Sequence, residues 1–540
     1  MSIETSYYNK NKEFSNPYIP IVLHLIPRIL TNLDRDKDSP TYGCFDRNFW
    51  HYKVHDYSSA VLQQCSLTLA FAYKCWFEGN IYYNSEIIKE YAIAGVKFCE
   101  KIQHKNGSFD EYWLGEGSVP ATAFTLYSIC ETCDHLDIQP DTSCIKKSVN
   151  FLNKHIETEV LNQEMASIAA IQYASEILKR NDYKELARKK FANFLLKQNN
   201  EGWFSEYGGL DLSYLTVNLD YLVRYYELSH DSKALYAAKK VLNLIKYFIH
   251  PDGSIGGEYG TRNTEYFAPY GIEFLKKHCP ISNEIIHRLF EYIYQDSYLN
   301  LNCDERYYLH YLNHSYIKSL FIYSYTPWNG KLPCDIKFEK YFNESNIFIK
   351  STNNYYFISN LSKGGVFKVF DKNNQTMNTD CGLRFFLDGD QYVTEMPNEN
   401  KCSINSGTIE ITMPFKKMNF VKQSFFKLFL LRIISFIFGI HAIGLTKKIM
   451  ILGSKSVTGM SATRSIILQE NNIKLIDSVS VGDKFGILKI SDNLSVRHTA
   501  SSRFFQTNTI GNKIKPEVFE IRGNLCISRY IEFSNKESKS

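Results

Sequence analysis

The chain has 540 residues, more than one ordinary hydrophobic core holds, so the sequence predicts two or three domains. Hydrophobic residues make up 44% of the chain, which excludes a disordered polymer. The formal net charge is +5, from 62 basic and 57 acidic residues. This excess is too small to indicate a nucleic-acid partner, although it is compatible with an anionic polymer bound in one local basic cleft.

Aromatic residues are unusually frequent, at 15% of the chain. Aromatic rings stack on the flat C–H faces of sugars, and Tyr hydroxyls hydrogen-bond to sugar oxygens, so this composition is compatible with carbohydrate binding. An AT-rich coding sequence also raises the content of Tyr, Phe, Asn, Ile and Lys, and aromatic residues fill ordinary cores. Both explanations of the composition stay open at this point.

Thirteen cysteines are scattered along the chain without the paired spacing that a zinc site needs, so neither a metal nor a cofactor is expected. Such cysteines are typical of buried thiols in a reducing compartment. Residues 1–20 are polar and lack the charged and apolar regions of a secretory signal. We therefore expect a cytoplasmic protein.

The first part of the chain, from about Tyr57 to Tyr325, has apolar residues at helical spacing. Examples are residues 58–77, 146–161 and 230–249, each long enough for one helix and polar on the opposite side. These runs predict a set of amphipathic helices.

A loop signature returns between these helices: a glycine, then an aromatic or apolar residue, then an acidic one. It occurs at residues 43–46, 107–110, 202–207 and 253–259. The glycines are 64, 95 and 51 residues apart, close to one, two and one helical hairpins. The pattern predicts an incomplete (α/α) toroid, or a helical solenoid, with these loops on one functional rim. A common tight turn after unrelated helices is the alternative.

After about Asp335 the chain changes to short segments rich in β-branched and aromatic residues. The predicted strands lie at residues 346–352, 355–361, 365–371, 383–389, 408–414, 464–470, 473–480, 484–490 and 525–533. So many strands in about 200 residues are typical of an antiparallel β-sandwich. The sequence therefore predicts an α+β multidomain protein, with a toroid domain at 1–334 and a β-sandwich domain at 335–540.

One segment, residues 415–455, fits neither domain. Residues 411–469 contain nine Lys and Arg but no Asp or Glu, and their centre is strongly apolar. Lys427 and Arg432 interrupt this centre, so it is too short to span a bilayer comfortably. On a helical wheel one side gathers Ser424, Arg432, Ser435, Gly439 and Ala442. We expect a helix that lies on an anionic membrane surface; a helix buried between the two domains is the alternative.

Several of these segments together resemble heparinase II/III-like proteins, which join an (α/α) toroid to a β-sandwich. The resemblance rests on residues 42–60, 106–124, 201–216, 250–271, 463–480 and 497–505. It covers most of the chain. It implies a polysaccharide lyase-like protein of the kind encoded in bacterial surface-polysaccharide gene clusters.

Lyases of this kind cleave polymers that contain uronic acids by β-elimination. The C5 proton beside the carboxylate is weakly acidic, so one group must neutralise the carboxylate, a base must remove the proton, and an acid must protonate the leaving oxygen. Tyr and His commonly serve as base and acid in these enzymes. Asn, Gln or Arg commonly neutralises the carboxylate.

The densest group of suitable side chains lies at residues 258–266, where glycines allow sharp turns. Arg262 can bind a carboxylate bidentately. Tyr259 or Tyr266 can act as base or acid if a nearby cation lowers its pKa. Glu258 and Asn263 are predicted to contact the substrate. As an alternative, Glu258 and Arg262 form an ion pair that only braces the loop.

Asn162 and Gln163 open another predicted helix. Lyases of the family often carry Asn followed by His at such a place, so Gln163 departs from the family pattern and weakens the expectation of classical lyase chemistry. Asn162 is predicted to neutralise the substrate carboxylate, and Gln163 to contact substrate. A helix N-cap is the competing role for Asn162.

His55 is the predicted histidine for proton transfer, because Asp56 can orient its ring. A structural hydrogen bond between these two residues is the alternative. Further substrate contacts are expected from residues upstream of His55 and on the same rim: Arg47, Trp50, Lys53, Glu116, Asp211 and Tyr214.

The sequence therefore predicts a lyase-like enzyme that acts on an acidic polysaccharide or a lipid-linked oligosaccharide. A uronyl C5-epimerase is close in mechanism, because it removes the same proton. A non-catalytic glycan-binding or assembly protein that keeps the fold is the alternative of a different class. The expected location is the cytoplasm, peripheral at the inner membrane, with no nucleic-acid partner.

Overall fold

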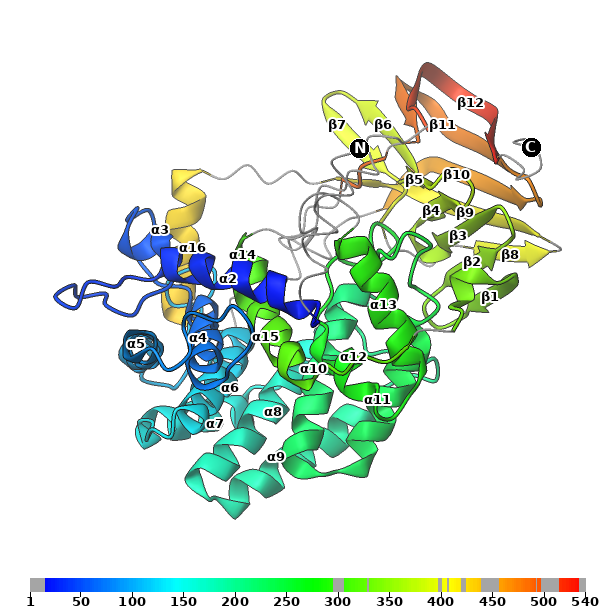
Figure 1. Ribbon diagram of the computed structural model, residues 1–540. Helices are drawn as coiled ribbons and strands as arrows, with labels where there is room; N and C mark the ends of the chain where they lie inside the picture. The colour runs from blue at the N-terminus through cyan, green and yellow to red at the C-terminus, as the bar shows by residue number, and fades with distance from the viewer. Residues whose placement is uncertain are drawn as a thin grey trace, which may run out of the picture.

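The computed structural model describes residues 15–294, 305–327, 330–396, 401–405, 407–418, 424–438, 456–491, 493–496 and 514–533. Helices make up the first part of the chain and two antiparallel sheets the second (Figure 1). In chain order the helices are α2 (Tyr18–Asn32), α3 (Arg47–Trp50), η1 (Ala60–Gln64), α4 (Cys65–Lys74), α5 (Glu86–Ile102), α6 (Val119–His135), α7 (Thr142–Lys154), α8 (Leu161–Leu178), α9 (Asn181–Leu195), α10 (Leu212–Ser229), α11 (Ser232–Ile245), α12 (Tyr270–Leu275), α13 (Ile281–Ile293), α14 (Glu305–Tyr307), η2 (Tyr308–Leu312), α15 (Asn313–Ile322), η3 (Pro333–Asp335), η4 (Leu361–Lys363) and α16 (Phe425–Phe438).

The helical part has an inner and an outer layer. Helices α6, α8 and α10 are buried on nearly all sides, whereas α5, α7, α9 and α11 bury one side only. The sequence explains the difference: α8 is rich in Ala, Ile and Ser, while α9 carries Lys and Arg on its outer side. A helix that is apolar on all sides is stable only when it is buried, so the composition of α8 places it in the inner layer and that of α9 in the outer layer.

The inner helices form a closed ring. Each of α4, α6, α8, α10, α12 and α15 contacts the next, and α15 contacts α4. Their outer partners among the described elements are α5, α7, α9, α11, α13 and α2 respectively. The prediction of an incomplete toroid is corrected on this point. Helix α2, the first in the described residues, packs on α15, the last α-helix before β1, where Asn16 also donates a hydrogen bond to the carbonyl of Leu320 at 2.8 Å.

The repeated glycines mark one recurring turn. Gly43, Gly107, Gly202 and Gly253 all have positive φ, between 87° and 106°. A Cβ added at these glycines would lie 2.1 to 2.8 Å from a carbonyl oxygen of the following outer helix. Both the positive φ and the close contact with the outer helix therefore require glycine at these four positions. The loop signature that repeats in the sequence corresponds to the same turn in the structure.

The β part contains two antiparallel sheets. One has the order β1-β2-β3-β4-β5, and the other has the order β10-β11-β6-β7-β9-β8, with β12 paired to β11. Hydrophobic residues of both sheets contribute to one buried cluster. The strands are β1 (Phe338–Phe342), β2 (Ile347–Ser351), β3 (Tyr355–Asn360), β4 (Val366–Asp371), β5 (Thr376–Asp380), β6 (Leu383–Leu387), β7 (Asp390–Val393), β8 (Lys401–Asn405), β9 (Thr408–Lys417), β10 (Ser456–Leu468), β11 (Asn472–Ile490) and β12 (Glu517–Glu532). The coarse prediction, a helical part followed by an antiparallel β part, is confirmed.

Several predicted element boundaries were wrong. The run 146–161 is not one helix: α7 ends at Lys154, where His155 turns to extended backbone, and α8 begins at Leu161. The two predicted strands at 473–480 and 484–490 are one strand, β11, whose pairing with β12 shifts register between Ser480 and Phe485. That irregularity explains why the apolar alternation breaks in the sequence.

Helix α16 covers the described centre of the segment 415–455 and is inserted between β9 and β10. It lies beside the helical part near α3, away from the two sheets (Figure 1). Arg432 pairs with Asp56, and Ser435 is 1% exposed against the backbone of Gly115. Because most of its large apolar side chains are exposed, α16 is not buried between the helical part and the β part. No helix in the described ranges is long and apolar enough to cross a membrane.

Candidate active site at the junction of the helical and β parts

Two loops of the helical part interlock beside the start of α8: residues 205–211 before α10 and residues 256–266 before α12. Asp211 joins them, because its carboxylate caps α10 and accepts hydrogen bonds from the backbone N–H of Arg262 at 2.9 Å and from the hydroxyl of Thr264. Burial raises the pKa of Asp211, and these hydrogen bonds oppose that rise. Asp211 therefore sits at the joint between the two loops.

Asn162 and Gln163 lie against the first of these loops. The side-chain amide of Asn162 donates to Glu206 Oε2 at 2.7 Å, and its backbone N–H donates to Glu206 Oε1 at 2.9 Å. The N-cap of α8 is Val160, without a side-chain cap, so Asn162 is not the helix cap. Asn162 Oδ1 and Gln163 Oε1 are buried and accept no hydrogen bond from any described residue. These two amide oxygens are therefore buried acceptors that a sugar hydroxyl or a water would satisfy.

Arg262 lies in a cluster with three tyrosines. Its guanidinium carbon lies 4.0 Å from the centre of the Tyr207 ring, a cation–π contact. The Tyr214 ring lies 6.4 Å from that of Tyr207 and 6.3 Å, edge-on, from that of Tyr266. One guanidinium and three phenols thus form one cluster. Sequence reasoning missed Tyr207, although it stands in the repeated loop signature.

Two lysines of the β part hold the second loop from the other side. Lys363 Nζ donates to the carbonyls of Glu258 and Gly260 and, at 2.8 Å, to Asn263 Oδ1. Lys368 Nζ lies 2.5 Å from Glu265 Oε1 and 3.1 Å from Glu258 Oε2. Sequence reasoning missed both lysines.

The electrostatics of this junction follow from burial. Burial alone would lower the pKa of Lys368, but the carboxylates of Glu258 and Glu265 outweigh it and raise that pKa. Burial raises the pKa of Glu265 to about 7, against the effect of Lys368. A Cβ on Gly257 would lie 2.3 Å from Lys368 Nζ, so the glycine lets the lysine reach the carboxylates.

Tyr259 faces the interior of its loop and is fully buried. Its hydroxyl accepts from the backbone N–H of Gly256 at 3.0 Å and is hydrogen-bonded to His250 Nε2 at 2.9 Å. Burial raises the pKa of Tyr259 and lowers that of His250 well below its usual value. The pair braces the loop. Asn263, also predicted to bind substrate, donates its amide to Ser495 Oγ at 2.9 Å.

The candidates around His55 form a separate group at the other end of the rim. Arg47 and Trp50 each donate a hydrogen bond, at 2.9 and 2.8 Å, to a carbonyl at the end of α2. The His55 ring stacks on Tyr57 with 5.2 Å between centroids, while Asp56 pairs with Arg432 of α16. Lys53 is exposed. These contacts join the group to α2 and α16 rather than to Arg262.

Glu116 is also enclosed by its own loop. Its carboxylate accepts the backbone N–H groups of Glu111 and Tyr112 at 3.0 and 2.7 Å. Burial, followed by the repulsion of Glu111, raises the pKa of Glu116 to about 8. The predicted contact of Glu116 with sugar hydroxyls stays a prediction, and in this structure its carboxylate is engaged within its own loop.

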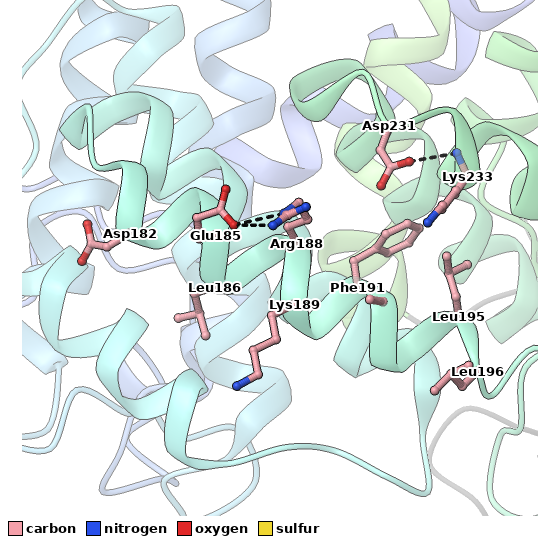
Figure 2. Close-up of a pocket in the computed structure, with 11 residues that line it drawn as sticks. Asp182, Glu185, Leu186, Arg188, Lys189, Phe191, Leu195, Leu196, Asp231 and Lys233 are labelled. Atoms are coloured by element: carbon pink, nitrogen blue, oxygen red, sulfur yellow. Dashed lines mark hydrogen bonds and ion pairs between the residues drawn. The ribbon is translucent and has the colours of Figure 1, made fainter.

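A groove of about 940 Å³ on the outer side of the helical part lies away from these groups (Figure 2). It is lined by α9 and the start of α11. Its charged side chains are engaged locally: Arg188 donates to Glu185 at 2.7 Å, and Asp231 accepts the backbone N–H of Lys233 at 2.9 Å. None of the predicted site residues lines this groove.

The loops of a helical toroid thus meet an antiparallel β part, a fold arrangement that known polysaccharide lyases share. Comparison with known proteins agrees. Residues 84–271, from just before α5 to the start of α12, match the family model of the ulvan lyase N-terminal domain. The predicted resemblance to (α/α)-toroid polysaccharide lyases is confirmed.

Solved structures of lyases share the fold at low sequence identity. A Paenibacillus xanthan lyase aligns with 12% identity and a TM-score of 0.52 over 88% of this chain and 46% of the lyase. A Streptomyces coelicolor A3 chondroitin AC lyase, solved with chondroitin sulphate, aligns with 10% identity and a TM-score of 0.52 over 87% of this chain and 71% of that enzyme. The chain thus spans less than half the length of the xanthan lyase. A search of curated proteins gave no match.

Proposed function

We propose that this protein is a polysaccharide lyase-like enzyme that removes the C5 proton of a uronic-acid residue and cleaves the chain by β-elimination. The observation that carries the proposal is the clustering of Arg262, Tyr214 and Tyr266, with Asn162 joined to the same pair of loops through its hydrogen bonds to Glu206. The similarity to lyase structures supports the fold on which this chemistry rests. The proposed substrate is an acidic polysaccharide or a lipid-linked oligosaccharide of surface-polysaccharide metabolism.

Each step has a proposed residue. Arg262 neutralises the uronate carboxylate, helped by the second N–H of the Asn162 side-chain amide, whose first N–H donates to Glu206, and this makes the C5 proton more acidic. Tyr266 or Tyr214 removes that proton, the electron pair forms the C4–C5 double bond, and the C4–O bond breaks. The other phenol protonates the leaving oxygen. Gln163 holds a sugar hydroxyl. No cofactor takes part in this scheme.

The domain plan is part of the same proposal. We place the toroid at residues 1–334 and the β-sandwich at 335–540, since α15 ends at Ile322 and β1 begins at Phe338. Hydrophobic side chains from both sheets fill one cluster, which supports a sandwich. The site then lies where the loops of one domain meet the other.

A non-catalytic glycan-binding or assembly protein is the second candidate. It is favoured by one observation: Arg262, Tyr214 and Tyr266 are each no more than 6% exposed, and His55 makes its contacts elsewhere. A polar site this enclosed is well suited to rigid recognition without proton transfer.

The test uses purified full-length protein and a panel of acidic polysaccharides, including ulvan, xanthan and chondroitin sulfate. The ultraviolet absorbance of the unsaturated uronyl product is followed with time. Tyr266→Phe and Arg262→Ala should each lower the rate at least about 100-fold. Exposed residues of the same types provide the matched controls: Tyr236→Phe and Arg188→Ala should retain the wild-type rate.

A flat trace on every polymer would count against β-elimination. The same samples are then analysed for solvent deuterium at C5, because an epimerase removes and returns that proton without cleavage. Deuterium incorporation that Arg262→Ala abolishes would assign an epimerase. Saturable glycan binding without exchange would assign the non-catalytic protein.

A further inference from the structure

Helix α16 presents an unusual amount of apolar surface to solvent. Its large apolar side chains are exposed by fractions from 41% at Ile433 to 90% at Phe436. The exposed residues are Phe425, Phe426, Leu428, Phe429, Leu430, Ile433, Phe436, Ile437 and Phe438. Contiguous apolar surface of this kind on a folded protein marks an interaction site.

The helix is turned the opposite way from a helix in a soluble core. The side that faces the protein carries its one buried residue, Ser435, which is 1% exposed and has its backbone against Gly115, and Arg432 pairs with Asp56. Of its large apolar side chains, Leu431 and Ile434 are half-buried and the others are exposed. A helix on the surface of a globular protein normally buries its apolar side. The apolar side of α16 therefore needs a partner that the described part of the chain does not supply.

The loops next to α16 extend the same apolar surface. Tyr52 and Val54, just before Asp56, are 59% and 68% exposed. Tyr112 and Leu114, just before Gly115, are 41% and 44% exposed. Since Asp56 and Gly115 contact α16, two rim loops and the helix bring apolar side chains to one place.

The charge of the segment identifies the partner. Residues 411–469 carry nine Lys and Arg and no acidic residue. Lys416, Lys417 and Arg464 of this set lie on β9 and β10, and Arg432 pairs with Asp56, while Lys427 is exposed on α16 itself. A second copy of the chain packed symmetrically on α16 would bring these like charges together, at a cost. Anionic lipid headgroups attract such a segment while the acyl region accepts Phe, Leu and Ile.

We propose that α16 and the two rim loops beside it bind the surface of an anionic lipid bilayer, with the helix lying in the interface. The 14 residues of α16 span about 21 Å, shorter than the roughly 30 Å hydrocarbon core. The helix lies along the surface with the side of Ser435 on the protein and its exposed apolar side chains in the lipid. This binding goes beyond the proposed lyase chemistry and does not depend on it.

The experiment measures flotation of the full-length protein with vesicles. One set is phosphatidylcholine alone, and the other contains phosphatidylglycerol as the anionic lipid. Wild-type protein should float with the anionic vesicles. Phe436→Ser should weaken this binding at least about tenfold, because a buried phenylalanine is lost from the lipid. Lys427→Glu should weaken it by about tenfold through charge reversal.

Leu196→Ser provides the matched control, because Leu196 is 84% exposed on the far side of the helical part and should not affect flotation. Phe436 and Lys427 are both exposed on α16, so neither Phe436→Ser nor Lys427→Glu disturbs a core. Absence of flotation with anionic vesicles would overturn the proposal. Equal flotation with both vesicle types would also overturn it, since the charge would then play no part. Light scattering that shows a dimer lost in Phe436→Ser would assign the surface to a second copy.

Discussion

The four glycine turns of the toroid share one backbone conformation but have different partners. The loops after Gly43 and Gly107 satisfy their own polar groups and contact α16, as at Glu116 and Asp56. The loops after Gly202 and Gly253 instead interlock with each other and with the β part. The turn therefore positions a loop on the rim, and the surface that packs on the loop decides its chemistry.

The largest effect on stability is expected at the buried ion pairs that Lys368 forms with Glu258 and Glu265 in the loop after Gly253. Lys368→Met should lower the free energy of unfolding by about 3–5 kcal/mol, because two carboxylates would lose their buried cation. The measurement is urea unfolding at neutral pH. Adding Glu265→Gln should restore part of the loss. An unchanged free energy of unfolding would show that the β part does not brace this loop.

The shared turn itself can be broken at one site. Gly107→Ala should lower the free energy of unfolding by at least about 2 kcal/mol, since a left-handed backbone and a clash with Lys147 O both oppose the Cβ. Gly389→Ala provides the control for backbone strain alone: its φ is +81°, with nothing within 4 Å of the added Cβ. It should cost only about 1 kcal/mol. Equal losses would mean that the close approach to the outer helix is unimportant.

The buried Glu116, in the loop after Gly107, should make the free energy of unfolding depend on pH. The raised pKa of Glu116, about 8, means that the folded protein favours its protonated form. Its contribution to stability is full below the unfolded pKa and is lost as pH rises through about 8. Wild-type protein should lose about 1–3 kcal/mol between roughly pH 5 and pH 8 that Glu116→Gln does not lose. Thermal unfolding across this range tests the prediction, and parallel profiles would refute it.

The smallest effect is expected where the first pair of loops meets α16. Arg432 and Asp56 have side chains that are 51% and 42% exposed, so their ion pair should contribute no more than about 1 kcal/mol. A double-mutant cycle with Asp56→Ala and Arg432→Ala measures this coupling. A coupling as large as that of Lys368 would mean that the two ends of the rim are braced alike.

The sequence predicted the features that depend on local pattern. Helical periodicity, the strand-rich second part and the four glycine turns can all be recognised within a few residues, because backbone conformation sets their composition. The closed ring was not predicted, since it depends on contact between α4 and α15, which are 245 residues apart at Thr68 and Asn313.

Within the candidate site, proximity in sequence was a partial guide. Arg262 and Tyr266 share a loop, and both belong to the observed cluster. Tyr259 lies in the same loop but points into the interior towards His250. Lys363 and Lys368 could not be predicted, because nothing near them in the sequence indicates that their ammonium groups contact a loop about 100 residues earlier.

The contacts of Lys363 with the helical part also limit which parts of this protein recombination can exchange. Its ammonium group donates to Glu258, Gly260 and Asn263, all in one loop of the other part of the chain. Recombination that joined this toroid to the β part of a relative would leave those acceptors unmatched unless a lysine arrived at the same place. A chimaera of this toroid with another β part should therefore need a lysine at the position of Lys363 to keep the loop in place.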